Sequence, residues 1–161
     1  MENKKEKLED FKTAISSTVR SLSNSQEIEI SFGNQAIKSS KNSIRLPDLE
    51  KGSNKLNYEK IRAIADSKSL NLRFSDMKTL KKYEPEGNIS KKLYSISEKI
   101  RCEKIGTSYF KGVKKNIEKY YYKRLSGLDL KSSEDKIVES FENYLRVKFL
   151  NFKNESEIDK R

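Results

Sequence analysis

A single glutamate interrupts the most regular apolar pattern in the sequence. Four apolar residues recur there at intervals of three and four, a spacing that places them on one face of a helix: Ile89, Leu93, Ile96 and Ile100. On a helical wheel of about 100° per residue, Glu103 falls on the same face. Because an unpaired buried carboxylate costs several kcal/mol, Glu103 needs a cation or backbone donors. We therefore expect it to accept a hydrogen bond from an arginine.

That arginine should come from another helix, since the cations next to Glu103 in the chain lie on other faces. Arg101 and Lys104 are the two neighbours in question. The candidates that we consider are Arg20, Arg45, Arg62 and Arg73. Two roles fit such a pair, because structural networks often imitate functional ones. It can orient helices within the domain, or it can contact a partner or ligand.

A run of tyrosines beside basic residues suggests a second kind of chemistry. Residues 120–124, Tyr-Tyr-Tyr-Lys-Arg, combine aromatic and basic side chains, which can stack on bases and neutralise phosphates in single-stranded nucleic acid. The chain also carries 35 Lys and Arg against 24 Asp and Glu, a formal net charge of +11, which attracts polyanions. A basic helical nucleic-acid-binding module is therefore the alternative function. Consecutive helical residues point to different faces, however, so we expect Tyr121 in the core.

Several common catalytic and ligand-binding motifs are absent from the sequence. Without histidine, the chain forms no Ser-His or Cys-His nucleophile pair and no metal-bound imidazole. Its six glycines stand singly, and neither a Walker loop nor G-x-G-x-x-G occurs. Residues 66–69, Asp-Ser-Lys-Ser, have the wrong spacing for a metal-ion-dependent adhesion site, and we expect them on an exposed helix surface. Surface carboxylates such as Glu134 and Asp135 leave a Mg2+-dependent enzyme as a third hypothesis. We expect no catalytic, cofactor-binding or metal-binding residue in this chain.

The first half of the chain predicts helices around two short strands. Residues 5–23 have the apolar spacing of an amphipathic helix, and residues 27–32 alternate like a half-buried strand. A second alternation ends at Pro47, so we expect a small antiparallel hairpin near residues 27–46. Asn57 and Ser75 can cap two further helices.

The second half of the chain predicts helices alone. One long helix or two should span residues 88–125, with Gly106 and Gly112 as weak points. The last helix should begin at Ser132, followed by an acidic first turn. Its expected buried residues are Ile137, Phe141, Tyr144, Leu145 and Phe149.

These elements predict a mainly α (α+β) fold, a helical domain with one small antiparallel hairpin. A chain of 161 residues suits a single domain, with a core over residues 8–150 and flexible ends at 1–7 and 151–161. The single cysteine, Cys102, indicates a reducing compartment. No apolar run approaches the roughly 20 residues that cross a bilayer, and the N-terminus lacks the apolar core of a signal peptide. We expect a cytoplasmic protein that does not associate with membranes.

The order of several short segments resembles one protein family. The segments are FKTAISSTVRSLS, EIEISFG, RLPDL, IRAIADSKSLNLRFSD, EPEG and IRCEKIGTSYFKGVKKNIEKYY, and the resemblance covers roughly residues 8–125. The residues with most weight are Phe32, Arg45, Leu46, Pro47, Ala65, Asp66, Leu72, Arg73, Asp76, Pro85, Gly87, Arg101, Glu103, Ile105, Gly106, Gly112, Val113 and Asn116. In this order they resemble the N-terminal domain of the CobT subunit of aerobic, ATP-dependent cobaltochelatase.

This resemblance implies a non-catalytic domain in an ATP-dependent ligase that forms nitrogen–metal bonds. The complex inserts Co2+ into hydrogenobyrinic acid a,c-diamide in aerobic cobalamin biosynthesis. It implies two partners, the AAA+ subunit CobS and the large subunit CobN, in an oligomeric assembly that uses ATP, Mg2+ and Co2+, while this domain binds no cofactor. The chain departs from the family pattern in two ways. It lacks histidines near residues 73–76 and 121–124, and it lacks the von Willebrand factor A domain with which the family usually continues.

Five residues are candidates for partner binding or for structural roles: Arg101, Glu103, Gly106, Lys114 and Arg124. A glycine at position 106 lets another backbone or side chain approach closely. The alternative for the region around residues 101–106 is a helix–helix contact within the domain. Lys114 and Arg124 are basic positions at which charge reversal would test partner binding.

Overall fold

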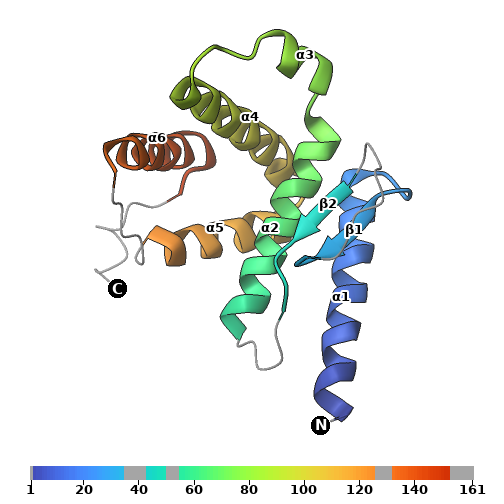
Figure 1. The fold of residues 1–161 in the computed structure, drawn as a ribbon. Coiled ribbons are helices and arrows are strands. Elements are labelled where there is room, and N and C mark those ends of the chain that lie inside the picture. The colour runs from blue at the N-terminus through green and yellow to red at the C-terminus, as the bar shows by residue number, and fades with distance from the viewer. Residues whose placement is uncertain (1, 35–42, 50–54, 126–131, 153–161) are drawn as a thin grey trace. The chain divides into compact units, whose positions relative to one another are not determined.

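The computed structural model describes residues 2–34, 43–49, 55–125 and 132–152. They form six helices and two short strands, so the expected mainly helical class is confirmed (Figure 1). In chain order the elements are α1 (Glu2–Ser23), β1 (Glu29–Phe32), β2 (Ser43–Leu46), α2 (Lys55–Phe74), α3 (Met77–Lys82), α4 (Asn88–Tyr109), α5 (Lys111–Leu125) and α6 (Ser133–Leu150). They divide into two compact units, Met1–Arg73 and Phe74–Arg161. No helix among the described residues is long and apolar enough to cross a membrane.

The first unit packs α1, α2 and the two strands around an apolar core. The buried cluster contains Ile15, Val19, Ile28, Phe32, Ile44, Leu46, Leu49, Ile61 and Ala65. Residues 66–69 of α2 differ from our expectation of an exposed surface, because Asp66, Ser67 and Ser69 are buried. Small polar side chains fit there, since Ser69 Oγ donates to the Ala65 carbonyl at 2.7 Å within the helix.

The two strands pair in parallel, so the predicted antiparallel hairpin is wrong. Glu29 is paired with Ser43 and Phe32 with Leu46. Alternation shows which side chains share a face but carries no information on strand direction. The connection over residues 33–42 is longer than hairpin loops of about 2–5 residues, and residues 35–42 lie outside the described part. Gly33 follows β1 at a positive φ of 61°, where a Cβ atom would meet Asp48 Cβ at 2.7 Å.

Of the three predicted helix N-caps, one agrees with the structure and two do not. Asn57 lies inside α2 and does not cap it. The cap of α3 is Asp76 and not Ser75, because the Asp76 carboxylate accepts from Lys78 N–H at 3.0 Å and from Thr79 Oγ1 at 2.6 Å. Ser132 caps α6 as predicted, with its hydroxyl accepting from the Asp135 N–H.

Of the two possibilities predicted for residues 88–125, one long helix or two, the structure has two, α4 and α5 in the second unit. Phe110 ends α4 with an extended backbone, φ −119° and ψ 89°, while its N–H still donates to the Gly106 carbonyl. Helix α4 packs against both α5 and α6. Residues 153–161 of the predicted tail lie outside the described part, whereas Asn151 caps α6 in a left-handed conformation and Phe152 is buried.

The rotation of α6 differs from the prediction. Ile137, Tyr144 and Phe149 are exposed, whereas the buried residues of the helix are Glu142, Arg146 and Leu150. The apolar spacing therefore does not identify the inward face of this helix. The charged residues turn inward because they find oppositely charged partners on the neighbouring helices, as described below.

A disulfide test distinguishes the parallel pairing from a hairpin. With Glu29→Cys and Ser43→Cys in one chain, we expect rapid disulfide formation under mild oxidation, because paired strand residues lie within the range of about 4.4–6.8 Å between Cα atoms. In an antiparallel pair these positions would lie about 10 Å apart along the strands. The measurement is a mass or gel shift, with Phe32→Cys and Ser43→Cys, which an antiparallel hairpin would place opposite each other, as the control pair. Preferential cross-linking of the control pair would contradict the parallel register.

Candidate functional site

The expected arginine partner of Glu103 lies on α6. Arg146 Nη1 donates to Glu103 Oε2 at 2.5 Å, and both side chains are almost completely buried, at 2% and 0% exposure. The predicted buried hydrogen bond to an arginine is therefore confirmed, and this arginine, Arg146, is not among the four that we considered. All four belong to the first unit, whereas Glu103 and Arg146 belong to the second.

A second carboxylate completes the binding of Arg146. Glu142 lies one helical turn before Arg146 on α6, and its Oε1 accepts from Arg146 Nη2 at 2.8 Å and from Nε at 3.2 Å. The guanidinium thus has carboxylates on both α4 and α6 within hydrogen-bond distance. A planar group with five donors suits this arrangement, because it can bind two carboxylates in fixed directions.

Two further cations extend the network to α5 and to the unit's surface. Lys99 Nζ lies 3.2 Å from Glu142 Oε1, and Arg124 Nη2 lies 2.9 Å from Glu142 Oε2. Arg124 also donates to Glu139 at 2.6 Å. The network therefore contains three cations and three carboxylates, so its formal charges balance. Such pairing is the condition under which charges can be buried at tolerable cost, and among the network's donors Arg124 Nε is the buried atom that has no hydrogen-bond partner in the described part of the chain.

Tyr121 lies at the centre of this network. The Arg146 guanidinium carbon is 3.2 Å from the centroid of its ring, and Arg124 and Lys99 lie at 4.8 and 5.2 Å. The Lys99 ammonium donates to the Tyr121 hydroxyl at 2.5 Å. Burial raises the pKa of Tyr121, so the phenol stays neutral. The prediction that Tyr121 belongs to the core is confirmed, and its ring is not available for stacking on bases.

The electrostatics of the network follow from burial and from the paired charges. Burial alone would raise the pKa of Glu142, but the nearby charges of Lys99, Arg146 and Arg124 outweigh it and lower that pKa. Burial likewise opposes the charged form of Arg146, yet the Glu103 and Glu142 carboxylates leave its pKa raised. Both groups are therefore ionised at neutral pH.

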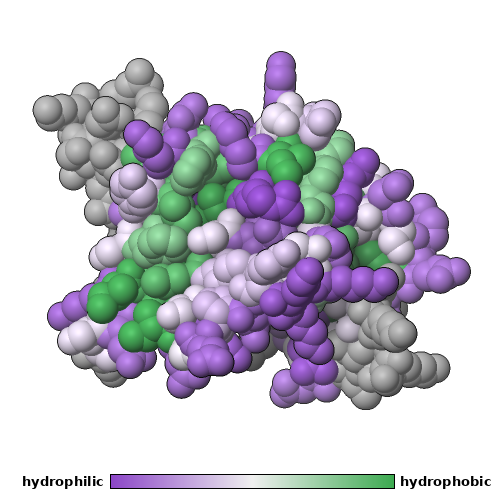
Figure 2. Space-filling view, turned by 90° about the horizontal axis from the view of Figure 1, so that it is seen from above, coloured by the Kyte–Doolittle hydropathy of each residue, from purple (hydrophilic) through white to green (hydrophobic). Residues whose placement is uncertain are grey.

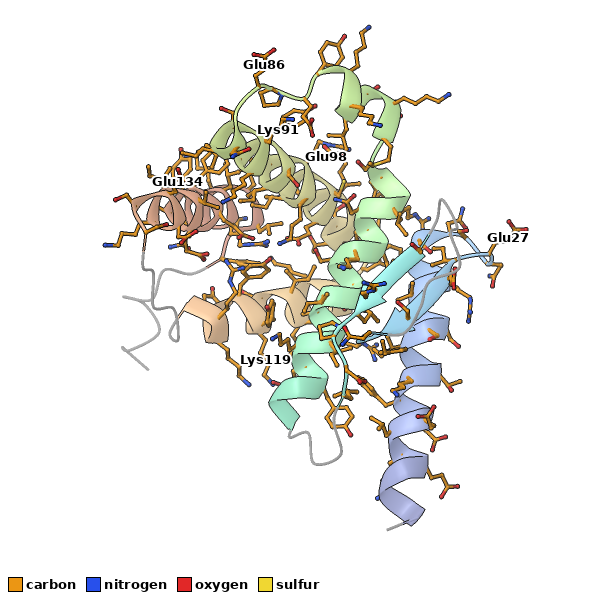
Figure 3. The ribbon with its side chains drawn as sticks, viewed as in Figure 1. Glu27, Glu86, Lys91, Glu98, Lys119 and Glu134 are labelled. Carbon is orange, nitrogen blue, oxygen red and sulfur yellow. The ribbon has the colours of Figure 1, made fainter. Side chains whose placement is uncertain are left out.

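The five predicted candidates occupy different environments. Glu103 and Arg124 belong to the network, while Arg101 is exposed on α4. Its Nε donates to Glu98, which Figure 3 labels on α4, at 2.7 Å, and its Nη2 donates to the Phe74 carbonyl at 2.6 Å. Gly106 is buried within α4, and Lys114 is half-buried on α5. The structure thus brings two of the five together.

Sequence reasoning missed four members of the network: Lys99, Glu139, Glu142 and Arg146. The available signal was the spacing of Glu142 and Arg146, an acid followed by a base four residues later. That spacing is also common on solvated helix surfaces, so it does not identify a buried pair. Only the partner residues on α4 and α5 distinguish the two cases.

An apolar groove lies between α4 and α6 beside the network. Its volume is about 430 Å³, which is within the range of ligand and peptide sites. The apolar lining comes from Ile100 and Ile105 of α4 and from Leu145 and Phe149 of α6, and the basic side chains of Arg101 and Lys104 border it. In Figure 2 apolar residues gather in a band on the side where Figure 1 places α4 and α6. Among the described residues no group of three or more potential ligands could hold a metal ion.

Comparison with known protein families shows the family to which the chain belongs. A family model described as cobalamin biosynthesis protein CobT matches residues 5–143. The chain belongs to the CobT family. The match includes most of both units and confirms the resemblance noted over residues 8–125. Membership of the CobT family implies a role in cobalamin biosynthesis. No solved structure matches the chain.

Removing the central guanidinium should destabilise the second unit strongly. Arg146→Met leaves the Glu103 and Glu142 carboxylates buried near each other, and breaking a buried pair in this way costs about 3–5 kcal/mol. Urea unfolding followed by circular dichroism measures the loss. The control is Lys148→Met on the exposed side of α6, for which we expect less than about 1 kcal/mol. Equal effects of the two variants would refute the role assigned to Arg146.

The lowered pKa of Glu142 predicts a specific loss of stability in acid. The unfolded chain binds a proton at Glu142 near the ordinary value of 4.5, whereas the folded chain does so only at lower pH. The contribution is therefore complete above pH 4.5 and is lost progressively as the pH falls below it. Glu142→Gln should flatten this acid dependence of the unfolding free energy, while Glu134→Gln, at the exposed start of α6 (Figure 3), should retain it. An unchanged slope in Glu142→Gln would contradict the charge assignment.

Proposed function

We propose that this chain is a non-catalytic subunit domain of an aerobic cobaltochelatase. In this proposal it assembles with the AAA+ ATPase subunit CobS and the large subunit CobN. The assembly inserts Co2+ into hydrogenobyrinic acid a,c-diamide in a reaction that consumes ATP. The observation that carries the proposal is the CobT family match, which extends through residues 5–143 and therefore includes both units.

The residue inventory supports a binding role over a chemical one. The chain has no histidine, so no imidazole is present to bind Co2+ or to act as a general base near neutral pH. Three groups with shifted pKa values, Glu142, Arg146 and Tyr121, contact one another where α4, α5 and α6 meet, so their shifts have a structural cause. We assign ATP, Mg2+ and Co2+ to the partner subunits.

The surface of the second unit supports partner binding. It combines an apolar groove with bordering cations, a combination that suits a protein segment better than a small metabolite ion. The net charge of +11 also favours association with acidic protein surfaces, because opposite charges steer partners together.

Association with the chelatase subunits tests this function. We expect the tagged chain to co-elute with CobS in the presence of ATP and Mg2+, or with CobN, at about 150 mM salt, where nonspecific charge attraction is screened. Nuclease treatment must leave the association intact, since a chain with a charge of +11 could otherwise be bridged by nucleic acid. Elution of the folded chain apart from both subunits would count against the proposal.

A further inference from the structure

Helix α6 presents its apolar side to solvent in the second unit. Ile137 is 52% exposed, Tyr144 61% and Phe149 51%, while Phe141 and Leu145 are half-buried. These five residues, which we call the α6 stripe, recur at the three- and four-residue spacing of one helix face. Contiguous exposed apolar residues rimmed by polar ones commonly mark interaction sites. The groove between α4 and α6 borders this stripe, because Leu145 and Phe149 belong to both.

The charges bordering the groove are basic, whereas exposed charges of both signs, such as Glu134 and Lys136, lie at the other end of the stripe near Ile137. Lys104 of α4 lines the groove, and Lys148 lies on the exposed side of α6 between Tyr144 and Phe149 in sequence. Neither lysine forms an ion pair with any residue in the described part of the chain. Arg101 also lines the groove, although Glu98 pairs with it. The uncompensated charge beside the groove, at the Phe149 end of the stripe, is therefore positive.

From these observations we infer that the α6 stripe and the adjoining groove bind an amphipathic helix of a partner protein, with large apolar side chains on one face and Asp or Glu along its edges. The stripe runs from residue 137 to residue 149, so it is about 18 Å long at 1.5 Å per residue and matches about three helical turns. Apolar anchors of such a helix enter the groove beside Phe149, and its carboxylates approach Lys104 and Lys148.

A second copy of the chain fits this surface less well. In a two-fold symmetric dimer the same patch occurs on both sides of the interface, so Lys104 and Lys148 of one copy would approach those of the other. Facing like charges oppose association, whereas an acidic segment neutralises them. The charge pattern thus selects a partner with acidic edges.

The inference rests on the proposed function only in the identity of the protein that supplies the helix. The binding chemistry of the surface can be tested without knowing that protein. The probe is a fluorescent peptide of about 14 residues, held helical by a side-chain cross-link because isolated short helices are unstable in water. It carries leucines on one face and glutamates on both edges. A second peptide has the same leucines and lysines in place of the glutamates. Anisotropy titration gives the two dissociation constants.

We expect the wild-type chain to bind the glutamate peptide at least about tenfold more tightly than the lysine peptide. Phe149→Ser should weaken binding at least about tenfold, as expected for an aromatic anchor. Lys104→Glu should reduce or reverse the preference between the peptides. Matched controls are Tyr83→Ser, an exposed aromatic outside the groove, and Lys92→Glu, an exposed lysine elsewhere on α4. Both should bind like wild type.

Equal affinity for the two peptides, or undiminished binding by a folded Phe149→Ser, would overturn the inference. Sedimentation of the chain alone provides the other test: if wild type dimerises and Phe149→Ser does not, the occupant is a second copy and the inference is wrong. Thermal unfolding establishes that each variant is folded. The two proposals can fail independently. If the wild-type chain does not associate with CobS or CobN, the proposed function is refuted, whereas the peptide result still decides the inference about the surface.

Discussion

Burial of the Arg146 guanidinium is the constraint on which the second unit depends. A cation in this position is tolerated only when carboxylates surround it, and here Glu103 comes from α4 and Glu142 from α6 itself. The Tyr121 ring of α5 lies against the same guanidinium. A rotation of α6 that turned its apolar stripe inward would remove Arg146 from Glu103 and leave that carboxylate buried without this cation. The pairing therefore fixes the rotation of α6.

The two units are stabilised by different physical means. In the first unit α1, α2 and the parallel strands bury a continuous apolar cluster around residues such as Ile15, Phe32 and Ile61. In the second, α4, α5 and α6 meet around a balanced set of charges and one tyrosine. Because those charges occupy the inward side of α6, Ile137, Tyr144 and Phe149 remain exposed, where they are available to a partner. The same pairing that stabilises the unit thus creates the surface on which we base partner binding in the CobT family.

The sequence predicted features set by local chemistry and missed those set by distant partners. The helix over residues 5–23, the Ser132 cap and the buried Glu103 follow from spacing, capping and the cost of a lone charge. The direction of the strands was missed because the alternation of apolar and polar residues shows which side chains share a face but not whether two strands run parallel or antiparallel. The inward face of α6 was missed because the sequence of a helix shows only which of its faces is most apolar. A charged face turns inward here because Glu103 and Tyr121, on other helices, bind Arg146. Arg146 was missed as the partner of Glu103 for the same reason.

Thiol labelling in α6 tests the rotation of this helix most directly. Tyr144→Cys and Leu150→Cys lie on opposite sides of α6, and the native Cys102 reacts slowly because it is buried and burial raises its pKa to about 12. The account predicts that native Tyr144→Cys reacts at nearly the rate of the unfolded chain, while native Leu150→Cys reacts at least about tenfold more slowly. Protection of Tyr144→Cys together with rapid labelling of Leu150→Cys would contradict it, because the apolar stripe would then face inward and the charged network could not form.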